Sequence, residues 1–109
     1  MANDVAVDES ANGGAVELAT GQELTVRLPE NRLAGYRWML DDAGEPASLC
    51  LGDAHEAPSQ AVGGQGAHEW RFQAVRDGEG TIALAYRRPW EQGQTAARSF
   101  TLRVRVNPA

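Results

Sequence analysis

Apolar and polar residues alternate with a period of two along much of this chain, and this alternation limits the fold more than any other feature. Residues 100–106 read FTLRVRV and residues 24–28 read LTVRL, so apolar side chains occupy every second position. A period of two places one face of a β-strand on the core. In no window of about 11 residues or more do apolar residues recur at spacings of three and four, as in an amphipathic helix. The sequence therefore predicts an all-β domain.

Shorter runs with the same period predict further strands, marked by Tyr36, Trp38 and Leu40, by Leu49 and Leu51, by Trp70 and Phe72, and by Ile82, Leu84 and Tyr86. About seven short strands in about 100 residues favour an immunoglobulin-like antiparallel β-sandwich, with a barrel as the alternative. Asp77-Gly78 predicts a turn that pairs the flanking strands as a hairpin. Cys50 is the single cysteine and cannot form an intramolecular disulfide, so we expect it in the core.

Length and charge narrow the classes of function. A chain of 109 residues suits one domain, and we expect a flexible leader over residues 1–14 and a single β-sandwich over residues 15–109. The net charge is −5 and the positive residues are scattered arginines, which disfavours a nucleic-acid partner. No apolar run reaches the roughly 20 residues of a membrane helix, so we expect no membrane partner. The start of the chain lacks a signal-peptide pattern, which predicts a cytoplasmic protein as given, or a periplasmic or secreted one if a signal peptide was removed.

Three segments outside the alternation combine turn residues with large side chains. They are residues 29–38, reading PENRLAGYRW, residues 62–70, reading VGGQGAHEW, and residues 87–94, reading RRPWEQGQ. The first alone reads as an ordinary inter-strand loop. The second is rich in glycine but lacks the lysine and the strand-to-helix context of a phosphate-binding loop. In the third, Pro89 ends a strand and Trp90 follows at a predicted loop tip, where an exposed indole indicates a binding surface.

The three segments together, in order and spacing, resemble the chagasin-type family of cysteine peptidase inhibitors. NRLAGYRW is similar to that family's N-P-T-T-G-Y loop, GQGA or the overlapping GGQG to its G-x-G-G loop, and RPW, at residues 88–90, to its R-P-W loop. The resemblance spans about residues 16–106. It implies an immunoglobulin-like β-sandwich that reversibly inhibits papain-like cysteine peptidases by setting three loops along the active-site cleft. It implies no catalytic residue, no metal and no cofactor.

The resemblance also implies which residues contact the peptidase. They are Asn31, Arg32, Leu33, Ala34, Gly35 and Tyr36 in loop 1, Gly63, Gly64, Gln65, Gly66 and Ala67 in loop 2, and Arg88, Pro89 and Trp90 in loop 3. By resemblance, loop 1 would enter the centre of the cleft near the catalytic thiol, and Trp90 would be the main anchor on the primed side. The chain departs from the family pattern at Arg32, Leu33 and Ala34, where proline and two threonines are usual. It departs again at Ala67, where a positive φ would cost about 1 to 2 kcal/mol.

Two other interpretations remain open from the residues. A sandwich module could bind carbohydrate or protein on a platform of Trp90, Tyr36 and Arg88, and such a platform could lie on a strand face. A structural immunoglobulin-like domain without a ligand would bury Trp90 and keep the three loops apart. The pairs His55-Glu56 and His68-Glu69 lack a third ligand at a recognisable spacing, so we expect surface polar residues and no metal site. We expect no enzyme, because no nucleophile elbow or cysteine–histidine spacing is present, and we expect a monomer.

Overall fold

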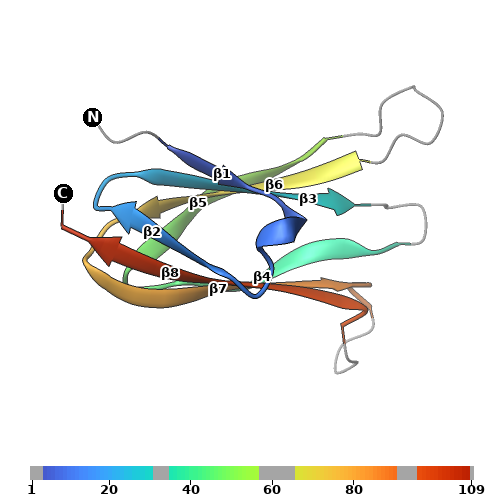
Figure 1. Cartoon of the computed structure of the whole chain (residues 1–109). Coiled ribbons are helices and arrows are strands. Elements are labelled where there is room, and N and C mark those ends of the chain that lie inside the picture. The colour runs from blue at the N-terminus through green and yellow to red at the C-terminus, as the bar shows by residue number, and fades with distance from the viewer. Residues whose placement is uncertain (1–3, 31–34, 57–65, 91–95, 109) are drawn as a thin grey trace.

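A computed structural model describes residues 4–30, 35–56, 66–90 and 96–108. These residues form eight strands and one 3-10 turn, shown in Figure 1. The elements in chain order are β1 (Val5–Val7), the turn η1 (Glu9–Ala11), β2 (Ala15–Ala19), β3 (Glu23–Glu30), β4 (Arg37–Ala43), β5 (Ser48–Glu56), β6 (Gly66–Ala74), β7 (Gly78–Arg87) and β8 (Arg98–Asn107).

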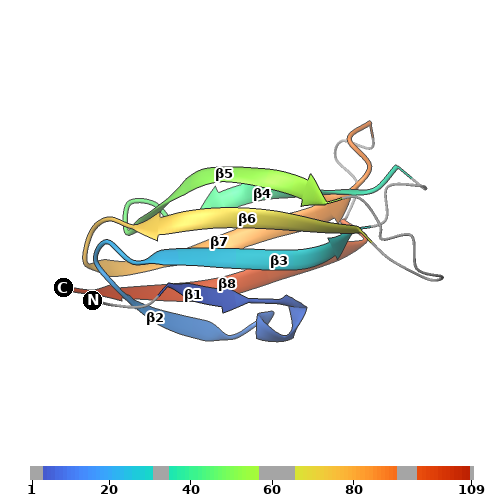
Figure 2. The ribbon, with the colours of Figure 1, turned by 90° about the horizontal axis from the view of Figure 1, so that it is seen from above.

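The strands form two four-stranded sheets packed face to face. One sheet has the order β1-β3-β6-β5 and the other the order β2-β8-β7-β4 (Figures 1 and 2). The predicted all-β sandwich is therefore confirmed and the barrel alternative is not. Two details differ from the prediction. The described strands number eight, and the pairs β1–β3 and β2–β8 are parallel, while every other pair is antiparallel.

The two inner faces build one core from the alternating residues. On β8, Phe100, Leu102, Val104 and Val106 are all buried, as their period predicts. The other large buried apolar side chains are Leu18, Leu24, Val26, Leu28, Trp38, Trp70, Phe72, Ile82 and Leu84. The polar residues between them face outward, which gives the pattern of two sheets packed face to face.

Residues 4–14 belong to the sandwich, which corrects the expectation of a flexible leader. Val5 and Val7 pair with β3 and pack against the core. Asp8 then accepts a hydrogen bond from the backbone N–H of Ser10 and begins the turn η1. Asn12 binds the backbone of β8 through both ends of its side-chain amide. A three-residue strand is too short to show a period in the sequence, so alternation could not predict it.

The side chains of β5 that face the core are not the predicted ones, Leu49 and Leu51. Leu49 and Leu51 are 37% and 39% exposed, while Cys50 between them is half-buried against the core. The register of β5 on β6 shifts between Cys50 and Gly52, which is a β-bulge. A bulge adds one residue and reverses which side chains face inward. Asp53 follows the bulge and therefore faces inward. It lies in the half of β5 that leads to residues 57–65.

The turn at Asp77-Gly78 joins the two sheets and does not form the predicted hairpin. β6 pairs with β3 and β5, whereas β7 pairs with β4 and β8. Gly78 has a φ of 137°, a conformation that glycine adopts without strain, so the prediction of a turn at this position is confirmed. Turn residues mark where the chain reverses, but they do not say whether the next strand pairs with the last or crosses to the facing sheet.

Candidate functional site

The strand ends that flank all three predicted loops lie at one end of the sandwich. In the first sheet, Glu30 at the end of β3 pairs with Gly66 at the start of β6, and Glu56 at the end of β5 pairs with Ala67. In the second sheet, the start of β4 pairs with the end of β7, which in turn pairs with the start of β8. Figures 1 and 2 show these six strand ends together, on the right in both views. The strand ends on both sides of residues 31–36, 57–65 and 88–97 therefore lie at the same end of the sandwich.

Seven of the predicted site residues fall within the described part of the chain. They are Gly35, Tyr36, Gly66, Ala67, Arg88, Pro89 and Trp90. The others lie outside the described residues, namely Asn31, Arg32, Leu33 and Ala34 of loop 1, and Gly63, Gly64 and Gln65 of loop 2.

Loops 1 and 3 touch each other through Gly35 and Trp90. Gly35 has a φ of 85°, in the left-handed region that glycine adopts without strain. A Cβ atom at this position would overlap the Trp90 indole, with Cζ2 only 3.2 Å away. Trp90 is nonetheless 68% exposed, the largest exposed fraction among the large apolar side chains that the structure describes. The indole thus rests on a backbone position that has no side chain and presents most of its surface to solvent.

Aromatic rings continue from this contact down into the core. Tyr36 stacks on Tyr86 with the ring centroids 5.3 Å apart, and Tyr86 lies 5.0 Å from Trp38. The guanidinium of Arg88 lies 4.7 Å above the Tyr36 ring and 6.0 Å from the Trp90 ring. A planar cation between two aromatic rings joins them by cation–π attraction. This stack connects loop 1 and loop 3 to β4 and β7.

Gly66 and Ala67 of loop 2 are buried at the start of β6, between β3 and β5. A Cβ atom on Gly66 would lie 2.7 Å from the carbonyl oxygen of Glu56 and 3.1 Å from that of Glu30. The glycine is therefore needed for the close approach of three strands. No described residue other than glycine has a positive φ, so Ala67 sits in ordinary extended backbone. The predicted strain at Ala67 does not occur.

A polar cluster with a buried centre lies at the strand ends that lead into loops 1 and 2, and the sequence analysis missed it. It consists of Glu30, Asp53, His55 and His68, called here the carboxylate–histidine cluster. Glu30 is 1% exposed and His68 is 4% exposed, so the expectation of surface polar residues is wrong for His68. The available signal was Glu30 itself, which continues the inward-facing series Leu24, Val26 and Leu28 of β3 at the next even position.

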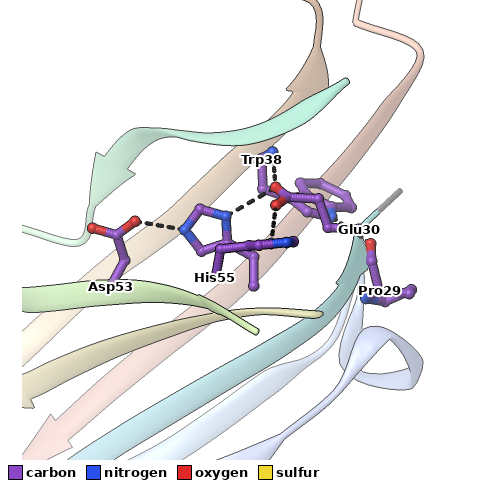
Figure 3. A network of polar contacts seen from close by, with 6 residues as sticks. Pro29, Glu30, Trp38, Asp53 and His55 are labelled. Atoms are coloured by element: carbon purple, nitrogen blue, oxygen red, sulfur yellow. Dashed lines mark hydrogen bonds and ion pairs between the residues drawn. The ribbon is translucent and has the colours of Figure 1, made fainter. Parts of the chain in front are cut away.

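Glu30 is the centre of this cluster. Its Oε2 atom accepts hydrogen bonds from the backbone N–H of Trp38 at 2.7 Å and from Nδ1 of His68 at 2.9 Å. Its Oε1 atom lies 2.7 Å from Nδ1 of His55, an ion-pair contact whose alignment falls short of a hydrogen bond. Figure 3 shows the Glu30 carboxylate pointing between Trp38 and His55. On the far side of the His68 ring, Nε2 lies 2.5 Å from Oδ2 of Asp53.

Ion pairs on the outer face of the same sheet end hold three strands together. Nη1 of Arg27 on β3 lies 2.8 Å from Glu56 on β5 and 3.0 Å from Glu69 on β6. The hydrogen bond from Arg27 lowers the pKa of the Glu56 carboxyl below its usual range. The same two carboxylates raise the pKa of Arg27. All three groups are exposed, so the contribution of these pairs to stability is small and is screened by salt.

Within the described ranges, no three His, Cys, Asp or Glu side chains are arranged to hold a metal ion. In the carboxylate–histidine cluster the ring nitrogens contact carboxylate oxygens directly. The same part of the chain contains no helix long and apolar enough to span a bilayer.

Comparisons with known proteins agree with this geometry. The chain is 28% identical over 102 residues to amoebiasin-1 of Entamoeba histolytica, covering 94% of this chain and 99% of that protein. The crystal structure of the cysteine protease inhibitor EhICP2 from Entamoeba histolytica superposes with a TM-score of 0.85 at 22% identity, covering 96% of this chain and 97% of the other. The inhibitor PbICP-C, solved in complex with falcipain-2, superposes with a TM-score of 0.56 at 18% identity, covering 97% and 90%.

The family comparison matches most of the chain. The model of the family described as "Chagasin family peptidase inhibitor I42" matches residues 17–104, which contain all three predicted loops. That family is one of peptidase inhibitors and not of enzymes, as the sequence predicted. The chain belongs to the chagasin family of peptidase inhibitors.

Proposed function

We propose that this chain is a reversible, stoichiometric inhibitor of papain-like cysteine peptidases that binds through the end of the sandwich where loops 1, 2 and 3 begin and end. One observation supports this most strongly. Trp90 is 68% exposed and rests on Gly35, so the two loops that resemble the family's binding loops form one continuous surface. An exposed tryptophan braced in this way is the kind of residue that dominates binding energy at interfaces.

Inhibition in this account is occlusion without cleavage. The end of loop 1 at Gly35 contacts Trp90 of loop 3, and the residue before loop 1, Glu30, belongs to the carboxylate–histidine cluster. The backbone of loop 1 would cover the catalytic thiol while no carbonyl carbon reaches the geometry that nucleophilic attack requires. Trp90 would pack against aromatic residues of the enzyme, and Arg88 would offer planar hydrogen bonds. The complex would bury about 800 Å² on each partner.

The geometry favours this function over the two other interpretations. A ligand-free structural domain predicts a buried Trp90 and separated loops, and the structure shows an exposed Trp90 in contact with loop 1. A carbohydrate platform on a strand face would need its aromatic residues there, whereas Tyr36 and Trp90 lie at the end of the sandwich. We also propose that the chain acts as a monomer, because one copy holds all three loops.

Titration against papain and a cathepsin L-type enzyme, each active-site titrated, tests the proposal. Residual activity should fall in proportion to added protein, recover on dilution, and leave the inhibitor uncleaved. A folded chain that inhibits neither enzyme at tens of micromolar would overturn it.

A further inference from the structure

The carboxylate–histidine cluster occupies a position that packing alone does not explain. It lies in the core-facing stripe, where four titratable side chains replace apolar ones at the loop end of the sandwich. Removing charges from water is expensive, and a buried ion cluster is weak evidence for stability. Such a cluster is better explained by the strand ends that it holds in fixed positions.

Its contacts join the strands that begin and end two loops. Glu30 is the last residue of β3, before loop 1, and Trp38 is the second residue of β4, after loop 1. The Glu30 carboxylate accepts from the Trp38 N–H, and the indole Nε1 of Trp38 donates to the carbonyl of Pro29 at 2.8 Å. These two hydrogen bonds connect β3 of one sheet to β4 of the other, which are the strands before and after loop 1 (Figure 3).

The same carboxylate also binds the strands on either side of loop 2. His55 is the next-to-last residue of β5 and His68 is the third residue of β6, and their Nδ1 atoms lie 2.7 and 2.9 Å from the two oxygens of Glu30. Since the Glu30 side chain is fully buried, water does not compete for these contacts. One carboxylate thus fixes the base of loop 1 relative to the base of loop 2.

The His68 ring lies between two carboxylates. Both of its nitrogens face carboxylate oxygens, Nδ1 toward Glu30 on β3 and Nε2 toward Asp53 on β5. The ring therefore connects the ends of two strands. Stacking of the His68 ring on Trp70, with centroids 4.6 Å apart, holds the ring in this orientation.

The described charged groups of the cluster come from three strands. Besides Glu30 of β3, β5 contributes Asp53 and His55 and β6 contributes His68, and the backbone N–H of Trp38 on β4 donates to Glu30. On the other side of Trp38, the guanidinium of Arg98 from β8 lies 5.9 Å above the ring. The carboxylates that pair with Arg27 lie on the outer face of the sheet.

We propose that Glu30 is a positioning residue for inhibition: through Trp38, His55 and His68 it sets the base of loop 1 relative to the base of loop 2. The proposal rests on the proposed function for its inhibition readout. Loss of the Glu30 carboxylate would remove the contacts to all three residues at once. Inhibition should therefore weaken when this carboxylate is replaced.

The test compares Glu30→Gln with Ser48→Ala. Ser48 begins the same strand β5 at the opposite end of the sandwich and donates one buried hydrogen bond, 2.7 Å long, to the carbonyl of Ala43. We expect Glu30→Gln to raise Ki by about tenfold or more, because a loop that is not preorganised binds less tightly. Ser48→Ala should stay within about twofold of the wild type, although it too loses a buried hydrogen bond.

The comparison of the two variants separates positioning from a general loss of stability. Both variants lose a buried hydrogen bond, so a rise in Ki that only followed stability would appear in both. A Ki for Glu30→Gln equal to that of Ser48→Ala would overturn the proposal. If Glu30→Gln does not fold, we expect His55→Gln to show a smaller rise in Ki, and a Ki for His55→Gln equal to that of Ser48→Ala would overturn the proposal.

A second readout distinguishes this failure from failure of the proposed function. If the wild type inhibits nothing, NMR amide shifts of Glu30→Gln still report on positioning. They should change at Trp38 and across residues 35–36 and 66–68, on both sides of the two loops. Changes confined to Glu30 and its sequence neighbours would contradict the proposed role.

Discussion

At the scale of single residues, two positions determine the shape of the proposed binding surface. Trp90 supplies exposed apolar area. Gly35 has no side chain and so leaves room for the indole ring against its backbone. Neither residue belongs to the core, so each can be changed with the sandwich retained. Their effects on inhibition and on stability should therefore separate.

Replacement of Trp90 by alanine tests the anchor. We expect Trp90→Ala to raise Ki by about 30-fold to nearly 1,000-fold, equivalent to roughly 2 to 4 kcal/mol, because a large apolar anchor is lost. Arg32→Ala should weaken inhibition less. The free energy of unfolding should change little in Trp90→Ala, since the indole is mostly exposed. Equal Ki values for Trp90→Ala and the wild type in an enzyme titration would show that Trp90 is not the anchor.

Replacement of Gly35 by alanine tests whether the contact between Gly35 and Trp90 positions the indole. The new Cβ would overlap the Trp90 ring, and the φ of 85° would be strained. We expect a loss of about 1 to 2 kcal/mol in unfolding free energy from the backbone conformation alone. Ki should rise as well, because Trp90 is displaced. Gly21→Ala is a matched control: Gly21 has a φ of 95°, with open space around its Cβ position, at the opposite end of β3. Gly21→Ala should lose stability without losing inhibition. A loss of inhibition in Gly21→Ala as large as that in Gly35→Ala would argue against a role for the contact between Gly35 and Trp90.

At the scale of elements, the ends of β3, β5 and β6 are joined on both faces. The carboxylate–histidine cluster joins them inside, and Arg27 joins them outside through Glu56 and Glu69. The β5 bulge makes the inner connection possible, because it turns Asp53 inward beyond Cys50. The two layers differ in their exposure to solvent, since Glu30 and His68 at the centre of the inner layer are buried and the groups of the outer layer are exposed.

The outer ion pair should respond to acid and salt. Arg27 lowers the pKa of Glu56 in the folded chain below its usual value of 4.5. Its stabilisation is therefore fully present above that value and is lost as the pH falls through the folded value. Chemical denaturation of the wild type and Glu56→Gln should show a small advantage for the wild type at pH 6. That advantage should shrink in 1 M salt and should also decrease as the pH falls below 4.5. An advantage that does not decrease with falling pH would contradict this account.

At the scale of the whole molecule, the alternation predicted the class of fold because burial on one face of a strand imposes a period of two. Phe100 to Val106 show this directly. The alternation did not predict which strands pair, since that depends on contacts between distant residues. The prediction of a turn at Asp77-Gly78 is therefore confirmed, but the predicted partner strand is wrong. The strand Val5–Val7 has three residues and is too short to show a period.

The site could be predicted only in part for the same reason. Short motifs identified loops 1, 2 and 3, because turn residues and an exposed tryptophan are local signals. The carboxylate–histidine cluster brings together residues from three strands that are far apart in the sequence. His68 and Asp53 have no local pattern in common, and a bulge decides that Asp53 faces inward. Only the folded arrangement reveals that these side chains meet.

Hydrogen–deuterium exchange of the chain, free and bound to papain, tests the central claim most directly. We predict that protection on binding will concentrate in residues 31–36, 63–67 and 88–90, at one end of the sandwich. The turns at Gly21, Gly44 and Asp77-Gly78, at the opposite end, should be unchanged. Protection of a strand face or of the opposite end, with the loops unprotected, would contradict the account.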